Sequence, residues 1–203
     1  MIEALWPETD PDQAAEKFWK QLGDMRRGLR SESNPTAKFV ERSGDIYRVE
    51  TGEFDVDVWR FDRLLAEAAE GNNTRESLSA AADLCGVELL EGVYYDWALP
   101  LRDHFRSQVI DILVEFAEVC DREGDPEEAA RALTRAIGLE PYAEHLYREL
   151  MNIYGKLCRA TDIQRVFREL EAALSEGLEA EPTEETLVLK DRLIRELAQG
   201  SDV

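Results

Sequence analysis

The sequence predicts a mainly α-helical protein, in which an array of paired helices follows one helix and a short β-hairpin. Three observations support this prediction. Apolar residues recur at spacings of three and four along most of the chain. A helical pattern in the C-terminal half repeats itself. Two short runs typical of β-strands occur only around the turn at Ser43-Gly44-Asp45.

The repeat has a spacing of 34 residues. Its matched positions are Leu113 with Tyr147, Phe116 with Leu150, Ala117 with Met151, Gly124 with Cys158, Ala129 with Ile163, Leu133 with Phe167, Ala136 with Leu170, and Pro141 with Ser175. A period of about 34 residues is typical of tetratricopeptide helix pairs, which stack side by side and bind partners. We therefore expect a tetratricopeptide-like array over residues 51–203. Ala129, Leu133, Ala136 and Pro141 are the residues expected to support close packing of its helices.

Residues 1–50 predict a small separate domain. Asp10-Pro11 precedes an amphipathic run from Asp12 to about Arg30, where Asp10 suits the helix cap and Pro11 the first helical position. After a loop, Lys38–Arg42 and Ile46–Val49 flank the turn and predict a β-hairpin. A helix followed by a two-stranded hairpin forms the second half of a winged helix-turn-helix.

The remaining apolar pattern predicts a series of further helices, separated by glycine and proline signals. Their expected ranges are 55–70, 74–84, 101–122, 127–138, 142–157, 162–176 and 183–198. Gly92 to Pro100 is expected to interrupt regular structure. There, Tyr94, Tyr95 and Trp97 are interpreted as a core plug, with an aromatic ligand cage as the alternative. Trp59 and Phe61 are predicted to belong to the core.

Composition limits the class of protein. The chain has 203 residues, of which 44% are hydrophobic, enough for a core. It has no apolar run long enough for a membrane span and no signal peptide pattern, so we expect a cytoplasmic protein. The three cysteines, Cys85, Cys120 and Cys158, are not in CxxC pairs and are interpreted as reduced thiols packed as small hydrophobic side chains.

Charge is distributed unevenly along the chain. Residues 1–50 hold 8 Lys and Arg against 10 Asp and Glu, a net charge of −2. Residues 51–203 hold 16 against 34, a net charge of −18. Because such a field repels phosphate backbones, the array is predicted to bind a protein or a small ligand rather than nucleic acid. The one basic stripe runs from Glu16 to Arg30, with a local net charge of +3.

The sequence gives little support to catalysis. His104 and His145 are the only histidines, and neither lies in a metal-ligand spacing such as HExxH, so both are interpreted as surface residues. There is no GxSxG motif and no glycine-rich phosphate loop. We therefore expect a protein that is not an enzyme and that uses neither a cofactor nor a metal.

Several short motifs, in order and at regular spacing, resemble the bacterial transcriptional activator domain family, which includes the antibiotic regulatory proteins (SARP). They are Leu5-Trp6-Pro7, Asp10-Pro11, Met25-Arg26-Arg27-Gly28-Leu29, Asp55-Val56-Asp57 with Phe61 and Leu64-Leu65, Leu89-Leu90-Glu91-Gly92 with Asp96-Trp97 and Leu101-Arg102, Pro141 with Glu144, Leu150-Met151 with Tyr154, and Glu181-Pro182-Thr183-Glu184-Glu185-Thr186. The resemblance implies a tetratricopeptide-like domain behind a winged helix of the response-regulator type. It makes Asp12 to Arg30 the recognition helix and Lys38 to Val49 the wing.

The candidate DNA contacts are the basic residues of these two segments: Lys17, Lys20, Arg26, Arg27, Arg30, Lys38 and Arg42. Two departures from the family pattern bear on them. Family chains usually begin some 70 or more residues earlier, so the first half of the DNA-binding fold is expected to be missing. Phe18, Trp19, Leu22 and Leu29 then need another cover, since exposing each forgoes roughly 1.5–3 kcal/mol. Glu16 and Gln13 also stand where the family tends to place a basic or amide residue.

Three functional hypotheses follow. The leading one is a transcription regulator's helical domain that binds other proteins, such as the transcription machinery, and pairs with itself as a homodimer, with DNA as a further partner of the N-terminal segment. The alternative is a stand-alone scaffold that binds a peptide or small signal and does not bind DNA. A third is a chain that pairs with full-length relatives and blocks them.

Overall fold

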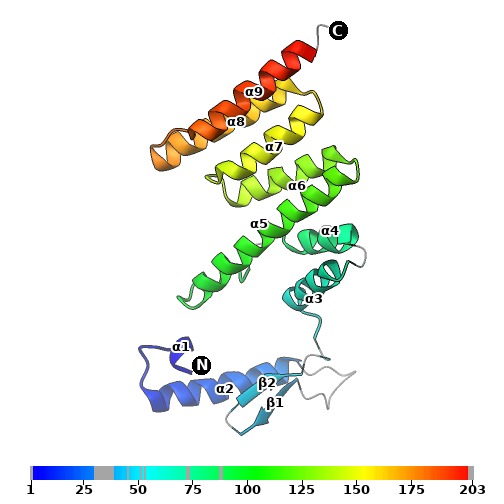
Figure 1. The fold of residues 1–203 in the computed structure, drawn as a ribbon. Helices are drawn as coiled ribbons and strands as arrows, with labels where there is room; N and C mark the ends of the chain where they lie inside the picture. Colours follow the sequence, from blue (N-terminus) through cyan, green and yellow to red (C-terminus); the bar gives the residue numbers. More distant parts are fainter. Residues whose placement is uncertain are drawn as a thin grey trace. The chain divides into compact units, whose positions relative to one another are not determined.

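The protein is mainly helical, with one two-stranded antiparallel hairpin among the residues that the structure describes (Figure 1). The structure is a computed structural model, and it describes residues 2–29, 39–44, 46–50, 52, 54–71, 74–86 and 89–200. The elements are α1 (Ile2–Leu5), α2 (Pro11–Leu29), β1 (Val40–Ser43), β2 (Ile46–Val49), α3 (Asp57–Ala69), α4 (Thr74–Leu84), α5 (Ala98–Arg122), α6 (Pro126–Leu139), α7 (Glu144–Lys156), α8 (Ala160–Leu178) and α9 (Glu184–Gly200). The predicted fold class is confirmed.

Contacts divide the chain into two compact units. The N-terminal unit comprises Met1–Arg60 and Gly92–Pro100, and the helical unit comprises Phe61–Glu91 and Leu101–Val203. Each is described by itself below. The predicted domain limits, 1–50 and 51–203, remain a prediction.

In the N-terminal unit, α2 begins where the sequence predicts. Asp10 Oδ1 accepts hydrogen bonds from the backbone N–H of Asp12 at 3.1 Å and of Gln13 at 3.4 Å, which satisfies two free donors of the first turn. β1 pairs with β2 in the register Val40↔Val49 and Ser43↔Ile46. Their turn contains Gly44 at φ 62°, a left-handed conformation that glycine adopts without strain.

The apolar side of α2 is partly covered within its own unit. Phe18 and Leu22 are buried, together with Val40 of the hairpin. The partly buried side chains packed against these three are Ile2, Trp6, Phe39 and Tyr47. Trp19 remains 49% exposed, although its ring lies 5.8 Å from that of Tyr47. The cover that we expected to come from elsewhere is therefore supplied for Phe18 and Leu22 by α1 and the hairpin.

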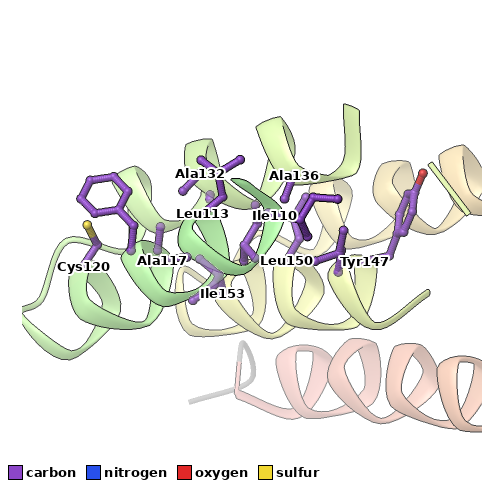
Figure 2. Packing of buried hydrophobic residues seen from close by; sticks show 14 of the residues in the cluster. Ile110, Leu113, Ala117, Cys120, Ala132, Ala136, Tyr147, Leu150 and Ile153 are labelled. Atoms are coloured by element: carbon purple, nitrogen blue, oxygen red, sulfur yellow. The ribbon is translucent and has the colours of Figure 1, made fainter. Parts of the chain in front are cut away.

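From α5 to α9, the helical unit is an array in which short connections turn each helix back along the preceding one. α7 packs against both α6 and α8, and α9 packs against α7 and α8. Figure 2 shows the core between these helices, where Ala132 and Ala136 of α6 lie among the larger side chains of α5 and α7. Ala136 and Ala129 are both fully buried. Small residues therefore stand at the places of close helix approach, as predicted.

The 34-residue repeat is also present in the backbone conformation. The twelve core positions of the six apolar pairs are all buried. Gly124 and Cys158, one period apart, both have left-handed φ values, 86° and 56°. After α5 the N–H of Asp125 donates to Cys120 O at 2.8 Å, and after α7 the N–H of Arg159 donates to Tyr154 O at 2.9 Å. The same left-handed helix ending thus closes both helices.

Cys158 carries a cost that Gly124 avoids, because a β-carbon disfavours the left-handed region by about 1–2 kcal/mol. Glycine loses more backbone entropy on folding, which offsets part of this gain. We expect Cys158→Gly to raise the free energy of unfolding by about 1 kcal/mol, measured by urea denaturation. Cys158→Ala keeps the β-carbon and serves as the control, which should unfold as the wild type does. Equal stability of the glycine and alanine variants would contradict this account.

Four sequence-based interpretations are wrong in part. Cys158 is exposed in the turn after α7, whereas Cys120 is buried, so only some of the thiols are packed. Tyr94 and Tyr95 are 89% and 53% exposed and are not a core plug.

The other two concern helices. Trp59 is 38% exposed although Phe61 is buried, because residues two positions apart on a helix do not share a face. Pro100 lies inside the first turn of α5, where a missing N–H costs no helix bond.

Candidate binding surfaces

The exposed side of α2 carries two lysines that have no partner among the described residues. Ala14, Phe18 and Leu22 define the buried side of the helix. Lys17 and Lys20 lie three residues apart and are exposed. Neither makes an ion pair or a hydrogen bond with another residue that the structure describes. Their ammonium groups are therefore available to an anionic partner.

The other predicted DNA contacts are engaged within the unit. Arg26 is half-buried and donates from Nη2 to Val40 O at 3.0 Å, which ties α2 to β1. Arg27 pairs with Asp24 one turn earlier. Both arginines thus have structural partners that a phosphate would have to displace.

Arg42 belongs to the hairpin turn. Its Nε donates to Gly44 O at 2.7 Å. Its guanidinium lies 5.6 Å from the ring centroid of Trp19 and 5.9 Å from that of Tyr47. Cation–π contacts of this kind hold Arg42 on the aromatic surface of the unit. Arg30 and Lys38, the remaining predicted contacts, lie outside the described residues.

In the helical unit, a groove of about 640 Å³ lies between α7 and α9. Its lining residues are His145, Arg148, Glu149 and Asn152 of α7 and Glu184, Glu185, Val188, Leu189 and Arg192 of α9. The α7 residues recur at three, four and seven positions, so they share one face of the helix. The opposite side of α7 is buried, with Leu146, Leu150 and Met151 in the core.

At the start of α7, next to the lining residue His145, the carboxylate of Glu144 contacts the start of α9. It accepts hydrogen bonds from the backbone N–H of Thr183 at 3.0 Å, from Thr183 Oγ1 at 2.7 Å and from Thr186 Oγ1 at 2.6 Å. Arg148 adds a bond from Nη1 to Thr186 Oγ1 at 3.1 Å. Because Thr186 is fully buried, the cluster fixes the start of α9 against α7.

The pKa of Glu144 is lowered by its partners. Burial acts to raise this pKa, but the hydrogen bonds from Thr186 and Thr183 and the charge of Arg148 outweigh burial. Glu149, in contrast, is half-buried and forms no hydrogen bond or ion pair with any described residue. Burial raises the pKa of Glu149, as does the nearby carboxylate of Glu118, while His145 and Arg148 act to lower it.

A second groove, of about 780 Å³, lies between α8 and α9. The ammonium of Lys190 lies 4.4 Å from the ring centroid of Phe167 and 3.1 Å from the Asp191 carboxylate. Arg168, Glu171 and Arg195, which also line it, are exposed. This groove therefore holds no buried charge that lacks a partner among the described residues.

Both histidines, His104 and His145, are exposed, as predicted. In the described part of the chain, no group of three His, Cys, Asp or Glu side chains is placed to hold a metal ion. Within the same residues, none of the helices combines the length and apolarity required to cross a membrane.

The fold is that of a helical-repeat protein that carries a small unit of helix and β-hairpin. Residues 56–194 match the bacterial transcriptional activator domain family. The chain belongs to this family, which confirms the resemblance seen in the motifs. The helix α2 with its hairpin is compatible with the second half of a winged helix.

Among solved structures, the chain is similar to Mycobacterium tuberculosis EmbR in complex with a low-affinity phosphopeptide. The TM-score is 0.72 at 21% sequence identity, over 96% of this chain and 53% of the EmbR chain. At this identity the likeness shows the fold. The chain spans about half the length of the EmbR chain. No curated protein sequence matches it.

The predicted DNA contacts all lie in the N-terminal segment, and the sequence did not predict the residues of the groove between α7 and α9 as a binding site. A signal for the groove was present in the polar residues His145, Glu149 and Asn152, which recur along one face of a helix. The partner of Glu144, 39 residues further along the chain, has no such local signal.

Proposed function

We propose that this chain is the regulatory part of a transcription regulator, in which the helical unit contacts other proteins and the N-terminal unit contacts DNA. The observation that carries the proposal is membership of the bacterial transcriptional activator domain family over residues 56–194. A protein of this class is regulatory rather than enzymatic, and it works where bacterial DNA lies, in the cytoplasm.

The charge of the helical unit supports a protein partner. Residues 51–203 carry a net charge of −18, which repels a phosphate backbone. The unit nevertheless offers two grooves along α9, of about 640 and 780 Å³. A surface of this kind suits a segment of protein, and candidates include the transcription machinery and full-length relatives of the chain.

The exposed lysines of α2 support a DNA contact by the N-terminal unit. Lys17 and Lys20 are unpaired within the described residues, and they lie on the helix that the resemblance makes the recognition helix. The predicted contacts Arg26, Arg27 and Arg42 have partners in the unit and contribute less. Contacts of two lysines with phosphates give weak binding, for which the plot of log K against log salt concentration has a slope of about −2.

We expect wild-type protein to bind a fluorescent duplex of about two helical turns, with a dissociation constant on the order of 10–100 μM near physiological salt. Replacing Lys17 and Lys20 by alanine should weaken binding and make the plot of log K against log salt concentration less steep by about 2. Fluorescence anisotropy across a salt series measures both quantities.

The control is the double variant Arg106→Ala/Arg122→Ala, which removes two exposed cations from α5 of the helical unit. It should bind the duplex as the wild type does. Absence of binding by the wild type at low salt would reject the DNA contact and support the alternative, a scaffold that works through protein contacts alone. The engagement of Arg26 and Arg27 within the unit is the observation that favours that alternative.

Self-pairing is a separate part of the proposal. Met25, Ile46 and Val49 are exposed apolar side chains of the N-terminal unit, and a second copy could cover them. Light scattering after size exclusion tests this directly. A monomer at all concentrations would remove the homodimer from the account and leave the other contacts standing.

A further inference from the structure

The groove between α7 and α9 has more anionic than cationic charge available to a partner. Its two cations are engaged: Arg148 pairs with Glu185 at 3.4 Å, and Arg192 lies 4.0 Å from Glu196. The carboxylates of Glu149 and Glu184 form no ion pair or hydrogen bond with described residues. The groove therefore offers carboxylate oxygens that can accept hydrogen bonds from a cationic group of a partner.

Glu149 is the more unusual of these two carboxylates, because it is half-buried whereas Glu184 is exposed. The titratable or charged groups near it are Glu118 from α5 and His145 and Arg148 from its own helix. Arg148 is already held by Thr186 and Glu185. Burial of an unpaired carboxylate opposes folding. Such a residue is typical of a binding site, where the missing partner comes from a ligand.

The same groove offers apolar contact beside the carboxylate. Val188 of α9 is 60% exposed, and the buried Leu189 also lines the groove. Arginine and lysine side chains have an aliphatic stem and a charged head, so they match a site with both features. The amide of Asn152 provides a further polar contact on the α7 side.

We propose that the groove between α7 and α9 binds a segment of a partner protein that places an arginine or lysine side chain against Glu149. The proposal rests on the protein-contact half of the proposed function and names the place and the chemistry of that contact. The net charge of −18 over residues 51–203 attracts a basic segment over a longer range and speeds its association.

The test uses the full chain and a defined probe, the peptide acetyl-Gly-Leu-Arg-Leu-Gly-amide. Amide chemical shifts followed by NMR should change at Glu149, Asn152 and Val188, with a dissociation constant on the order of millimolar, as expected for few contacts. The same peptide with neutral citrulline in place of arginine should cause no saturable change. Glu149→Gln should weaken binding about tenfold, the loss expected when one charged hydrogen-bonded pair is removed.

The matched control is Glu176→Gln, an equal change of charge at an exposed position of α8. It should bind the arginine peptide as the wild type does. Shifts that spread over the acidic surface and respond equally to both substitutions would overturn the proposal, because they would show attraction by net charge alone. Absence of any saturable shift in the groove would overturn it as well.

A melting-temperature measurement shows whether the Glu149→Gln variant is folded. Because Glu149 has no hydrogen-bond or ion-pair partner among the described residues and its pKa is raised, its ionisation opposes folding at neutral pH. Glu149→Gln should therefore melt at the same temperature as the wild type or higher at pH 7, with the difference vanishing as pH falls through the raised pKa. A lower melting temperature at pH 7 would mean that Glu149 has a structural partner, which contradicts the proposal.

DNA binding separates the failure of this inference from that of the proposed function. Glu149→Gln should bind the fluorescent duplex as the wild type does, since Glu149 lies in the helical unit and the lysines in the other. A chain that binds the duplex and not the peptide loses the groove inference alone. A chain that binds the peptide in the groove and not the duplex loses the DNA contact alone.

Discussion

Replacing Ala136 by phenylalanine is expected to lower the free energy of unfolding by about 1–3 kcal/mol, the cost of inserting a large side chain into a packed core. Ala136 is fully buried in α6, and Figure 2 shows it among residues of the neighbouring helices. A phenyl ring there must displace α6 from its neighbours or force strained rotamers. For a chain of this length, each kcal/mol corresponds to a melting temperature lower by roughly 2–4 °C.

Ala172→Phe is the matched control, because Ala172 is exposed on α8. It introduces the same side chain without disturbing a contact and should change stability by no more than about 0.5 kcal/mol. Urea denaturation followed by circular dichroism measures both variants. If Ala136→Phe unfolded at the wild-type urea concentration, the assignment of Ala136 to a helix-pair contact would be wrong.

Replacing Glu144 by alanine is expected to cost about 2–3 kcal/mol, since bonds to a charged group are worth about 1.5–3 kcal/mol and are not additive. The change removes the acceptor for the backbone N–H and the hydroxyl of Thr183 and for the hydroxyl of Thr186. Thr186 is fully buried, so water cannot replace the lost partner without opening the contact between α7 and α9. Hydrogen exchange should therefore increase most in α9.

The loss of stability caused by Glu144→Ala is expected to depend on pH. The folded-state pKa of Glu144 lies below its unfolded value, so the ionised carboxylate stabilises the fold above the unfolded pKa of about 4.3. This contribution is lost as pH falls through the lowered folded pKa. The stability difference between wild type and variant should thus be largest near neutral pH and shrink below about pH 4.

Glu181→Ala provides the control for Glu144, because Glu181 is an exposed carboxylate in the connection before α9. It should leave both stability and hydrogen exchange of α9 unchanged. A Glu144 variant that behaved as this control does would show that the threonine cluster does not hold α9.

Local signals in the sequence were sufficient for most of the helices. Capping residues such as Asp10 and Asp125 begin helices where expected, since a cap acts on amides two or three residues away. The 34-residue spacing pairs Gly124 with Cys158, and in the structure both residues follow the end of a helix with left-handed φ values. These features depend on neighbours close in the chain, which a single sequence displays.

Features that depend on distant parts of the chain were not predicted. The exposure of Tyr94 and Cys158 is set by which segments pack beside them, and residue type alone pointed the other way. The carboxylates of Glu144 and Glu149 are five residues apart on α7, yet one is held by hydroxyls of α9 and the other has no described partner. Tertiary contacts, rather than the chemistry of the residue, separate these two roles.

The candidate DNA contacts also show that the sequence does not reveal which residues have tertiary partners. A count of basic residues treats Lys17, Arg26 and Arg27 alike. The structure distinguishes them, because Arg26 bonds the hairpin and Arg27 bonds Asp24, whereas Lys17 is unpaired among the described residues. Among the described residues, Lys17 and Lys20, which have no described partner, remain the candidates for phosphate contacts.

We expect the helical unit to act on transcription through protein contacts, which a reporter assay would measure. The full chain would be fused to an unrelated DNA-binding domain, and transcription measured from a bacterial promoter that carries the binding site of that domain. We predict that the fusion changes transcription relative to the DNA-binding domain alone, and that Glu149→Gln reduces the change whereas Glu176→Gln does not. Transcription equal to that of the DNA-binding domain alone, with the fusion folded and present at the same level, would contradict the account.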